Sequence, residues 1–181
     1  MLSELRKRKF SYLFHCFDFD KNGVLEMADY EQFAKNLGKA YDLNADSTRY
    51  AALHAETMAL WDFIRNLADQ NHDNQVSEDE FTLAYTALTN DDAAFHHLLM
   101  GYAAYVIRSA DRDGNGLLDQ AEYVTILGCY GIEASAARTA FQHLDEDGNG
   151  LLSVIDMEKA FEQYFRSDDP NAAGNWMMGP F

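Results

Sequence analysis

The sequence is poor in cysteine and has no long hydrophobic run. Its two cysteines, Cys16 and Cys129, lie in helix-like stretches outside any CxxC or Cys/His metal spacing, which favours reduced thiols in a reducing compartment. No apolar run approaches the roughly 18 residues that span a bilayer. The amino terminus is basic, but His15 and Asp18 interrupt its apolar residues and no small-residue cleavage site follows, so we expect a cytoplasmic protein.

Basic residues are scarce compared with acidic ones. The chain has 30 Asp and Glu residues against 14 Lys and Arg residues, which gives a formal net charge of -16. Phosphate groups would be repelled, so we expect no nucleic-acid partner and no anionic membrane surface, and cations are the natural counterpart. The basic run from Arg6 to Lys9 fits a solvated helix face.

The sequence also lacks the common signatures of enzymes. It contains no HExxH motif, no recognisable Ser/His/Asp order and no glycine-rich phosphate loop. The histidines fall mostly in helical stretches, and none pairs visibly with a base or a nucleophile. They are His15, His54, His72, His96, His97 and His143. We therefore expect no enzymatic activity.

The sequence does contain one acidic twelve-residue motif that is repeated four times. The copies are DFDKNGVLEMAD (18–29), DQNHDNQVSEDE (69–80), DRDGNGLLDQAE (111–122) and DEDGNGLLSVID (145–156). Each copy places oxygen-bearing side chains at positions 1, 3, 5, 9 and 12, which is the ligand pattern of a calcium-binding loop. A single copy could be an ordinary acidic turn, but four copies in register argue against that interpretation.

The chemistry of a hard divalent cation explains this spacing. Calcium takes six to eight oxygens at about 2.3 to 2.6 Å, and a coiled loop presents alternate residues inward, with the carbonyl of position 7 as a further ligand. The candidate ligands are Asp18, Asp20, Asn22, Val24, Glu26 and Asp29 in the first loop; Asp69, Asn71, Asp73, Gln75, Ser77 and Glu80 in the second; Asp111, Asp113, Asn115, Leu117, Asp119 and Glu122 in the third; and Asp145, Asp147, Asn149, Leu151, Ser153 and Asp156 in the fourth.

The residues around the ligands fit the same interpretation. Position 6 must turn sharply, and three loops have glycine there. Position 8 is apolar in every copy and suits a short strand that pairs two loops; the residues are Leu25, Val76, Leu118 and Leu152. Apolar residues recur at helical spacing on both sides of the loops, so each loop is predicted to join two amphipathic helices.

With these motifs, the whole chain resembles the four-EF-hand proteins of the sarcoplasmic calcium-binding protein, calexcitin and calerythrin type. The loops start 51, 42 and 34 residues apart, unlike the nearly even spacing of calmodulin-like proteins, and the ending SDDPNAAGNWMMGPF is similar to the tails of some bacterial members. The resemblance implies an all-α EF-hand fold with two pairs of hands packed into one compact unit. We expect an N-terminal pair in residues 1–90, a C-terminal pair in residues 91–168, and a tail in residues 169–181 that packs on the core.

Two departures from the pattern bear on metal preference. Asn74 replaces glycine at position 6 of the second loop, and asparagine is the next most tolerant residue for a left-handed conformation. Asp29 and Asp156 stand at position 12, one methylene shorter than Glu80 and Glu122. We expect three or four calcium ions, with magnesium competing best at the first and fourth hands because it is smaller.

The resemblance leaves two functions open, a calcium buffer and a calcium sensor that binds target proteins. Sensors expose a methionine-rich groove, whereas the methionines here are scattered, which favours a monomeric buffer with no evident target. The apolar residues of the tail, Trp176, Met177, Met178 and Phe181, are predicted to plug whatever groove the hands leave. A calcium-triggered photoprotein, which shares this architecture, stays as a remote alternative.

Overall fold

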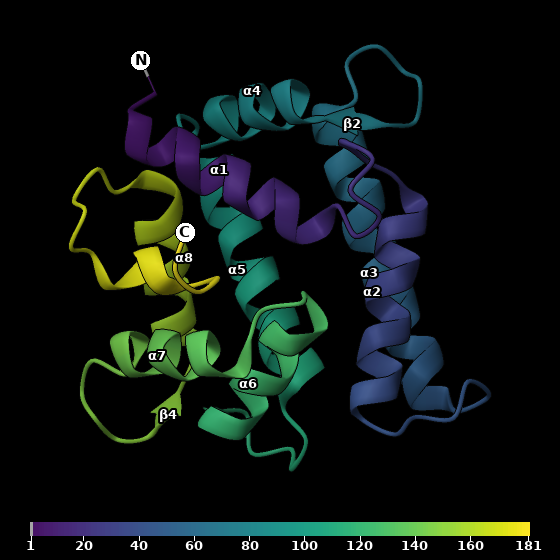
Figure 1. The fold of residues 1–181 in the computed structure, drawn as a ribbon, viewed down its shortest axis with the longest axis vertical. Helices are drawn as coiled ribbons and strands as arrows, with labels where there is room; N and C mark the ends of the chain where they lie inside the picture. The colour runs from purple at the N-terminus through teal and green to yellow at the C-terminus, as the bar shows by residue number, and fades with distance from the viewer. Residues whose placement is uncertain (1) are drawn as a thin grey trace. The chain divides into compact units, whose positions relative to one another are not determined.

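The computed structural model in Figure 1 describes residues 2–181, apart from the side chains of residues 99 and 100. The described chain is helical, with two-residue strands in the repeated loops. Its elements are α1 (Glu4–Phe17), β1 (Val24–Leu25), α2 (Met27–Ala40), α3 (Thr48–Ala68), β2 (Val76–Ser77), α4 (Glu78–Leu88), α5 (Asp92–Ala110), β3 (Leu118–Asp119), α6 (Gln120–Cys129), α7 (Ala134–Leu144), β4 (Leu151–Leu152), α8 (Val154–Arg166) and the 3-10 helix η1 (Ala173–Trp176). Each repeat thus lies between two helices, and the all-α EF-hand class predicted from the sequence is confirmed.

Local side chains set where several helices begin. Ser47 accepts a hydrogen bond from the Tyr50 amide at 3.1 Å, which caps α3, and Asp91 accepts one from the Ala94 amide at 3.0 Å, which caps α5. These bonds satisfy amides that have no partner within the helix. The start of each of these helices is therefore encoded in the residue that precedes it.

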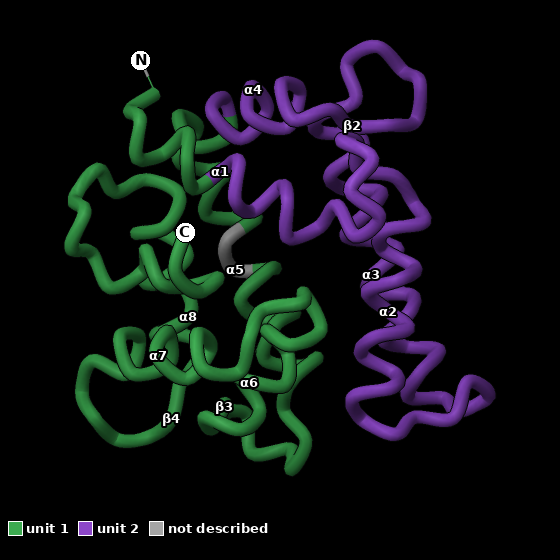
Figure 2. The backbone as a smooth tube through the Cα atoms, viewed as in Figure 1, with its two compact units in different colours: residues 1–9, 88–181 green, residues 10–87 purple. Residues whose placement is uncertain are grey.

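The chain forms two compact units, coloured separately in Figure 2. The unit Phe10–Ala87 contains the first two loops. Its strands pair antiparallel, with Val24 opposite Ser77. Tyr30 is fully buried, and its ring lies 5.4 Å from that of Phe17 and 5.3 Å from that of Trp61. The aromatic residues of α1, α2 and α3 therefore form the core beside the first loop.

The other unit comprises Met1–Lys9 and Leu88–Phe181. Its strands also pair antiparallel, with Leu118 opposite Leu152. Residues 173–178 lie against α7 and α8, beside the carboxyl terminus in Figure 1. The ring of Trp176 stacks on His143 of α7 with centroids 4.1 Å apart, and the Tyr123 hydroxyl of α6 donates to the Met177 carbonyl at 2.6 Å. The tail is thus an ordered part of this unit.

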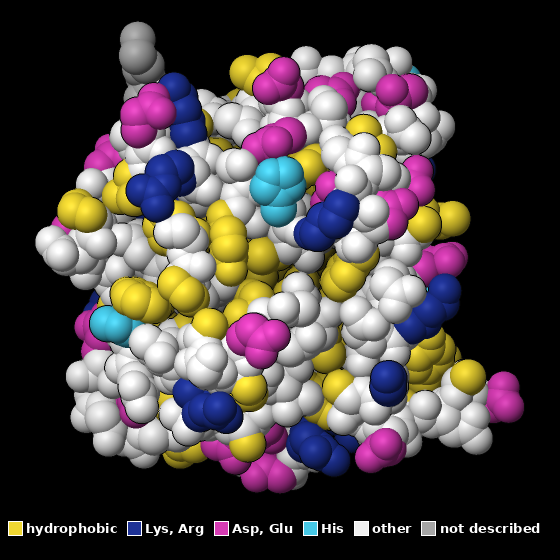
Figure 3. Space-filling model, in the orientation of Figure 1, with side chains coloured by type: hydrophobic (Ala, Val, Ile, Leu, Met, Phe, Trp, Pro, Cys, Tyr) yellow, Lys and Arg dark blue, Asp and Glu magenta, His cyan; other side chains and the backbone are white. Residues whose placement is uncertain are grey.

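The basic run of α1 differs from the solvated face expected of it. Lys9 is 0% exposed and contacts the end of α8, so this part of the expectation is wrong for Lys9. A helical periodicity shows which face a residue occupies but not whether another segment covers that face. Elsewhere, acidic and basic side chains are interspersed over the face shown in Figure 3.

The structure also shows the state of the two cysteines and whether any helix could cross a membrane. Both thiols are buried, and burial raises the pKa of Cys16 to about 11 and that of Cys129 to about 12, so both are protonated at neutral pH. Among the described residues, no helix combines the length and the hydrophobicity needed to cross a membrane.

Candidate metal centres

All four loops share one hydrogen-bond framework, which is shown best by the third. The Asp111 carboxylate at position 1 accepts hydrogen bonds from the amides of Asn115 at 3.3 Å and Gly116 at 2.9 Å. Asp113 accepts from the Asn115 amide at 3.0 Å, and Asn115 in turn accepts from the Leu117 amide at 2.7 Å. Each bond curls the loop around its acidic side chains. The same bonds recur in the other copies, at Asp18, Asp69 and Asp145.

Position 12 joins each loop to the helix that follows it. One carboxylate oxygen of this residue accepts from the amide of position 9 in every copy, at 2.8 to 3.1 Å, with Glu122 accepting from Asp119 as the example from the third loop. In α6 and α8 the position 9 side chain accepts in return from the position 12 amide, which makes a capping box. A candidate metal ligand therefore also caps the start of the helix.

The second oxygen of position 12 separates the fourth loop from the others. In the first three loops it accepts from the amide of position 2, at 2.9 Å for Asp29, 3.3 Å for Glu80 and 2.7 Å for Glu122. In the fourth loop the corresponding amide of Glu146 donates instead to the Leu144 carbonyl at 2.9 Å, and Asp156 accepts from the hydroxyl and amide of Ser153. The fourth loop is thus less tightly closed around its position 12 residue.

The carboxylates converge in the first and third loops. Asp18, Asp20 and Asp29 bring ligand oxygens within 4.8 Å of one another, and so do Asp111, Asp113 and Glu122. Among the described residues, these two groups alone meet this criterion, so the carboxylates of the second and fourth loops are not brought as close together. Both of these loops have Ser at position 9, Ser77 and Ser153, where the first and third loops have Glu26 and Asp119, so each has one ligand carboxylate fewer than the first and third.

Burial and hydrogen bonding shift the pKa values of the ligands in opposite directions. Burial of Asp29 in the first loop raises its pKa, which the acceptor bonds from Glu26 and Phe19 only partly oppose. The amide and hydroxyl of Ser77 lower the pKa of the half-buried Glu80. For Asp111, burial raises the pKa, but three loop amides outweigh it and the net shift is downward. The loops thus hold their carboxylates in distinct electrostatic environments.

The backbone is left-handed at position 6 of the second loop, as expected from the sequence, and also at position 4 of every loop, which was not predicted from the sequence. Asn74 takes the left-handed conformation expected at position 6, with φ of 63°. Position 4 is also left-handed in every copy, at Lys21 (59°), His72 (61°), Gly114 (77°) and Gly148 (69°). The glycines at this position in two copies were the sequence signal for it. The first two loops therefore hold non-glycine residues in a conformation that costs L-amino acids energy.

Comparison with known proteins shows full-length similarity to calcium-binding proteins. No protein-family model matches the chain. It is 26% identical to calerythrin of Saccharopolyspora erythraea over 153 residues, which cover 83% of this chain and 86% of calerythrin. It is 27% identical to sarcoplasmic calcium-binding protein 1 of Astacus leptodactylus, over 92% of this chain and 91% of that protein. Calexcitin-1 of Caenorhabditis elegans is 25% identical, over 95% of this chain and 85% of calexcitin.

Several solved structures have the same fold as this chain. A calcium-binding protein of Streptomyces coelicolor matches with a TM-score of 0.77 and 28% identity over 91% of this chain and 99% of that one. Its structure is described as the structural basis for prokaryotic calcium-mediated regulation by that protein. The amphioxus sarcoplasmic calcium-binding protein matches with a TM-score of 0.73 and 17% identity over 100% of both chains, which shows a shared fold alone. The photoprotein clytin matches with a TM-score of 0.73 and 19% identity over 96% of this chain and 93% of clytin, which shows a shared fold alone.

Proposed function

Because this chain is a four-EF-hand calcium-binding protein of the sarcoplasmic calcium-binding protein, calexcitin and calerythrin type, we propose that it acts as a calcium buffer. A buffer takes up calcium without opening a surface for a target, whereas a sensor opens. Sarcoplasmic calcium-binding proteins are among the full-length relatives, and we propose no enzymatic activity for the chain. We place the buffer in the cytoplasm as a monomer, in line with the buried reduced thiols.

The calcium ligands in this proposal are the residues at positions 1, 3, 5, 7, 9 and 12 of the four loops. The convergence of Asp111, Asp113 and Glu122, and of their counterparts in the first loop, supports two strong sites. The second and fourth loops have the same framework of hydrogen bonds with less convergent carboxylates, and they supply the weaker sites. The protein then binds three or four calcium ions, and magnesium competes most strongly at the first and fourth hands.

One observation carries the choice of a buffer, which is the burial of the tail. Met177 and Met178 are 2% and 3% exposed, and Gly174 packs so closely on α8 that an added Cβ would meet the Ala160 carbonyl oxygen at 2.4 Å. These residues cover the sides of α6, α7 and α8 that carry Tyr123, His143 and Ala160, which we call the covered face. A target helix has no access to the covered face while the tail lies on it.

A regulatory role is the second candidate, since the Streptomyces coelicolor protein is described in terms of calcium-mediated regulation. In that case the tail leaves the covered face when calcium binds, and the freed apolar surface takes an amphipathic helix. The two functions therefore predict opposite changes in exposed apolar surface on calcium binding.

Calorimetric titration of the metal-free protein, with and without millimolar magnesium, tests calcium binding directly. The proposal expects three or four ions, and a stoichiometry of two or fewer contradicts it. Fluorescence of a hydrophobic dye, followed during the same titration, separates the two functions. A buffer binds less dye when calcium is present, because calcium stabilises the closed fold by mass action. A gain of dye binding together with calcium-dependent capture of amphipathic peptides identifies a sensor.

A further inference from the structure

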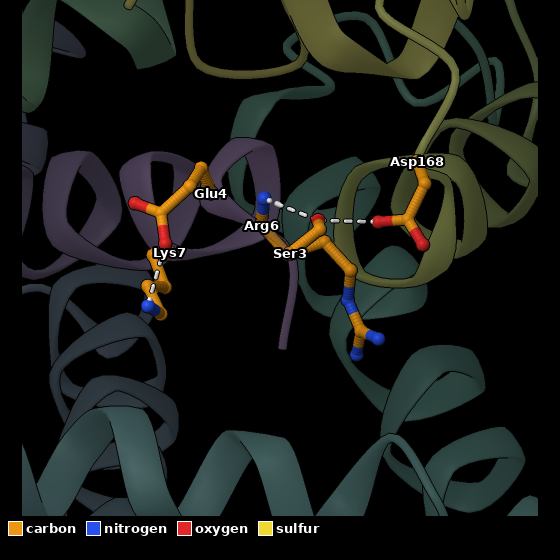
Figure 4. Close-up of polar contacts among 5 residues, drawn as sticks. All are labelled: Ser3, Glu4, Arg6, Lys7 and Asp168. Atoms are coloured by element: carbon orange, nitrogen blue, oxygen red, sulfur yellow. Dashed lines mark hydrogen bonds and ion pairs between the residues drawn. The ribbon is translucent and has the colours of Figure 1, made fainter. Parts of the chain in front are cut away.

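Segments from the two ends of the chain are joined by side-chain contacts within one compact unit. The Ser3 hydroxyl, drawn in Figure 4, accepts from the Arg6 amide at 3.2 Å and donates to the Asp168 carboxylate. The Arg6 guanidinium donates through Nε to the Phe165 carbonyl at 2.8 Å. We call Ser3, Arg6 and Lys9, together with residues 163–169 and Asn175, the terminal clasp. It lies outside all four candidate calcium loops.

Lys9 is the buried centre of the terminal clasp. Its ammonium group donates to the Ser167 carbonyl at 2.8 Å, to the Gln163 carbonyl at 3.3 Å and to the Asn175 side-chain oxygen at 3.1 Å. An ammonium group has three protons, so these acceptors match its full donor capacity. The Tyr164 hydroxyl also donates to the Lys9 carbonyl at 2.7 Å, which fixes the backbone of α1 against α8.

The acceptors of Lys9 belong to two different segments. The Gln163 and Ser167 carbonyls lie at the carboxyl end of α8, where a positive charge is favourable, and the Gln163 carbonyl also accepts from the Ser167 amide at 2.9 Å. Asn175 lies in the tail, is 5% exposed, and donates through Nδ2 to the Asp169 carbonyl at 2.9 Å. Burial lowers the pKa of Lys9 to about 8, so the group is still mainly charged at neutral pH. One buried cation thus ends α8 and anchors the tail.

We propose that Lys9 is a positioning residue of the terminal clasp, and that it holds the tail on the covered face when calcium is bound. This inference rests on the proposed buffer function and extends it. Asn175 immediately precedes Trp176, Met177 and Met178, so the contact with Lys9 restrains the part of the tail that packs on α6 and α7. The terminal clasp is therefore the device that keeps this EF-hand pair from opening as a sensor does.

The test compares Lys9→Met with Lys7→Met in the calcium-loaded protein. Methionine keeps the unbranched stem of Lys9 and removes its ammonium group. Lys7 lies on the same helix, but its side chain is 51% exposed and pairs with Glu4 at 2.7 Å, as drawn in Figure 4. For Lys9→Met we expect the hydrogen-exchange rates of the Asn175 and Met177 amides to rise about tenfold or more, because the variant loses hydrogen bonds to a charged group. We also expect a clear gain of dye binding. Lys7→Met should match the wild type in both measurements.

A second variant tests the contact between Lys9 and the tail, and a count of bound calcium ions distinguishes a failure of this inference from a failure of the proposed buffer function. Asn175→Leu leaves Lys9 bonded to α8 and removes the acceptor in the tail, so the tail should loosen while α8 keeps its protection. In a double-mutant cycle, the combined variant should loosen the tail by less than the sum of the two single effects, because both changes break the contact between Lys9 and Asn175, although Asn175→Leu also removes the bond to the Asp169 carbonyl. Additive effects, or a protected tail in Lys9→Met, overturn the inference. Calcium stoichiometry should stay at the wild-type value in every variant, and a low value in the wild type itself would contradict the proposed function instead.

Discussion

The first and third loops gather their carboxylates more closely than the second and fourth, although all four have the same ligand pattern. The length of the position 12 residue does not explain the difference, because Asp29 is in a convergent loop and Glu80 is not. Asp29 is 3% exposed and still reaches the Phe19 amide at 2.9 Å, so the start of α2 lies close to the first loop. The placement of the exiting helix therefore matters as much as the length of the ligand.

The largest expected effect comes from removing a position 1 carboxylate from each class of loop. Asp111→Ala should abolish the third site, since its carboxylate accepts from three loop amides and no neighbour replaces it. In a calcium titration, one ion should then be lost from the tighter phase. Asp145→Ala should instead remove one ion from the weaker phase, and Arg112→Ala, at position 2, should leave the stoichiometry unchanged. Loss from the same phase in both Asp variants would contradict the division into two classes.

A second prediction concerns a substitution in α2, the helix that follows the first loop. A Cβ added to Gly38 of α2 would lie 2.6 Å from the ring of Tyr50 on α3, whereas one added to Gly128 of α6 would meet nothing within 4 Å. Gly38→Ala should therefore lower the free energy of unfolding by about 1–3 kcal/mol through overpacking. Gly128→Ala should raise it by up to about 1 kcal/mol, since alanine favours a helix. Thermal or urea unfolding of the metal-free variants measures both.

Calcium titration of the same pair extends this test to the comparison between loops. If the position of α2 brings Asp29 into the first site, Gly38→Ala should weaken a tight site, and Gly128→Ala should leave the tight sites as they are. Destabilisation without any change in calcium affinity would show that the first loop closes independently of the packing between α2 and α3.

The helices and loops could be predicted from the sequence because their causes are local. A twelve-residue ligand pattern, apolar residues at helical spacing and an apolar position 8 specify each hand, and the strand pairing of Val24 with Ser77 follows from them. The burial of Lys9 could not be predicted in this way, since its acceptors Gln163 and Asn175 lie more than 150 residues away along the chain. The differing closure of the loops also depends on where the packed helices lie, which the ligand pattern does not encode.

A third prediction concerns backbone strain in the second loop. Asn74 has φ of 63°, while the equivalent Gly116 in the third loop has φ of 79° without the cost of a side chain. Asn74→Gly should strengthen calcium binding at the second hand by about 1 kcal/mol or less, because relief of strain is partly offset by the greater freedom of glycine in the unfolded chain. Gly116→Asn should weaken the third hand by a similar amount. Competition with a fluorescent chelator measures both, and a weaker second site in Asn74→Gly would show that the asparagine side chain contributes to binding.

The smallest effect is expected from lengthening position 12, and it differs between the two aspartates. Asp156 accepts hydrogen bonds from Ser153 of its own turn, and the amide of position 2, Glu146, donates to the Leu144 carbonyl instead of to Asp156. The added methylene of Asp156→Glu lets the carboxylate reach further toward the loop, so calcium preference over magnesium at the fourth hand should rise several-fold, since calcium favours a bidentate ligand. Asp29 already reaches both Glu26 and Phe19 from a buried position, and a longer side chain there meets a filled space. Asp29→Glu should therefore change selectivity at the first hand less than Asp156→Glu does at the fourth.

Calcium titrations at several magnesium concentrations measure both, and equal gains would mean that side-chain length alone, and not the placement of the exiting helix, sets how the loops close.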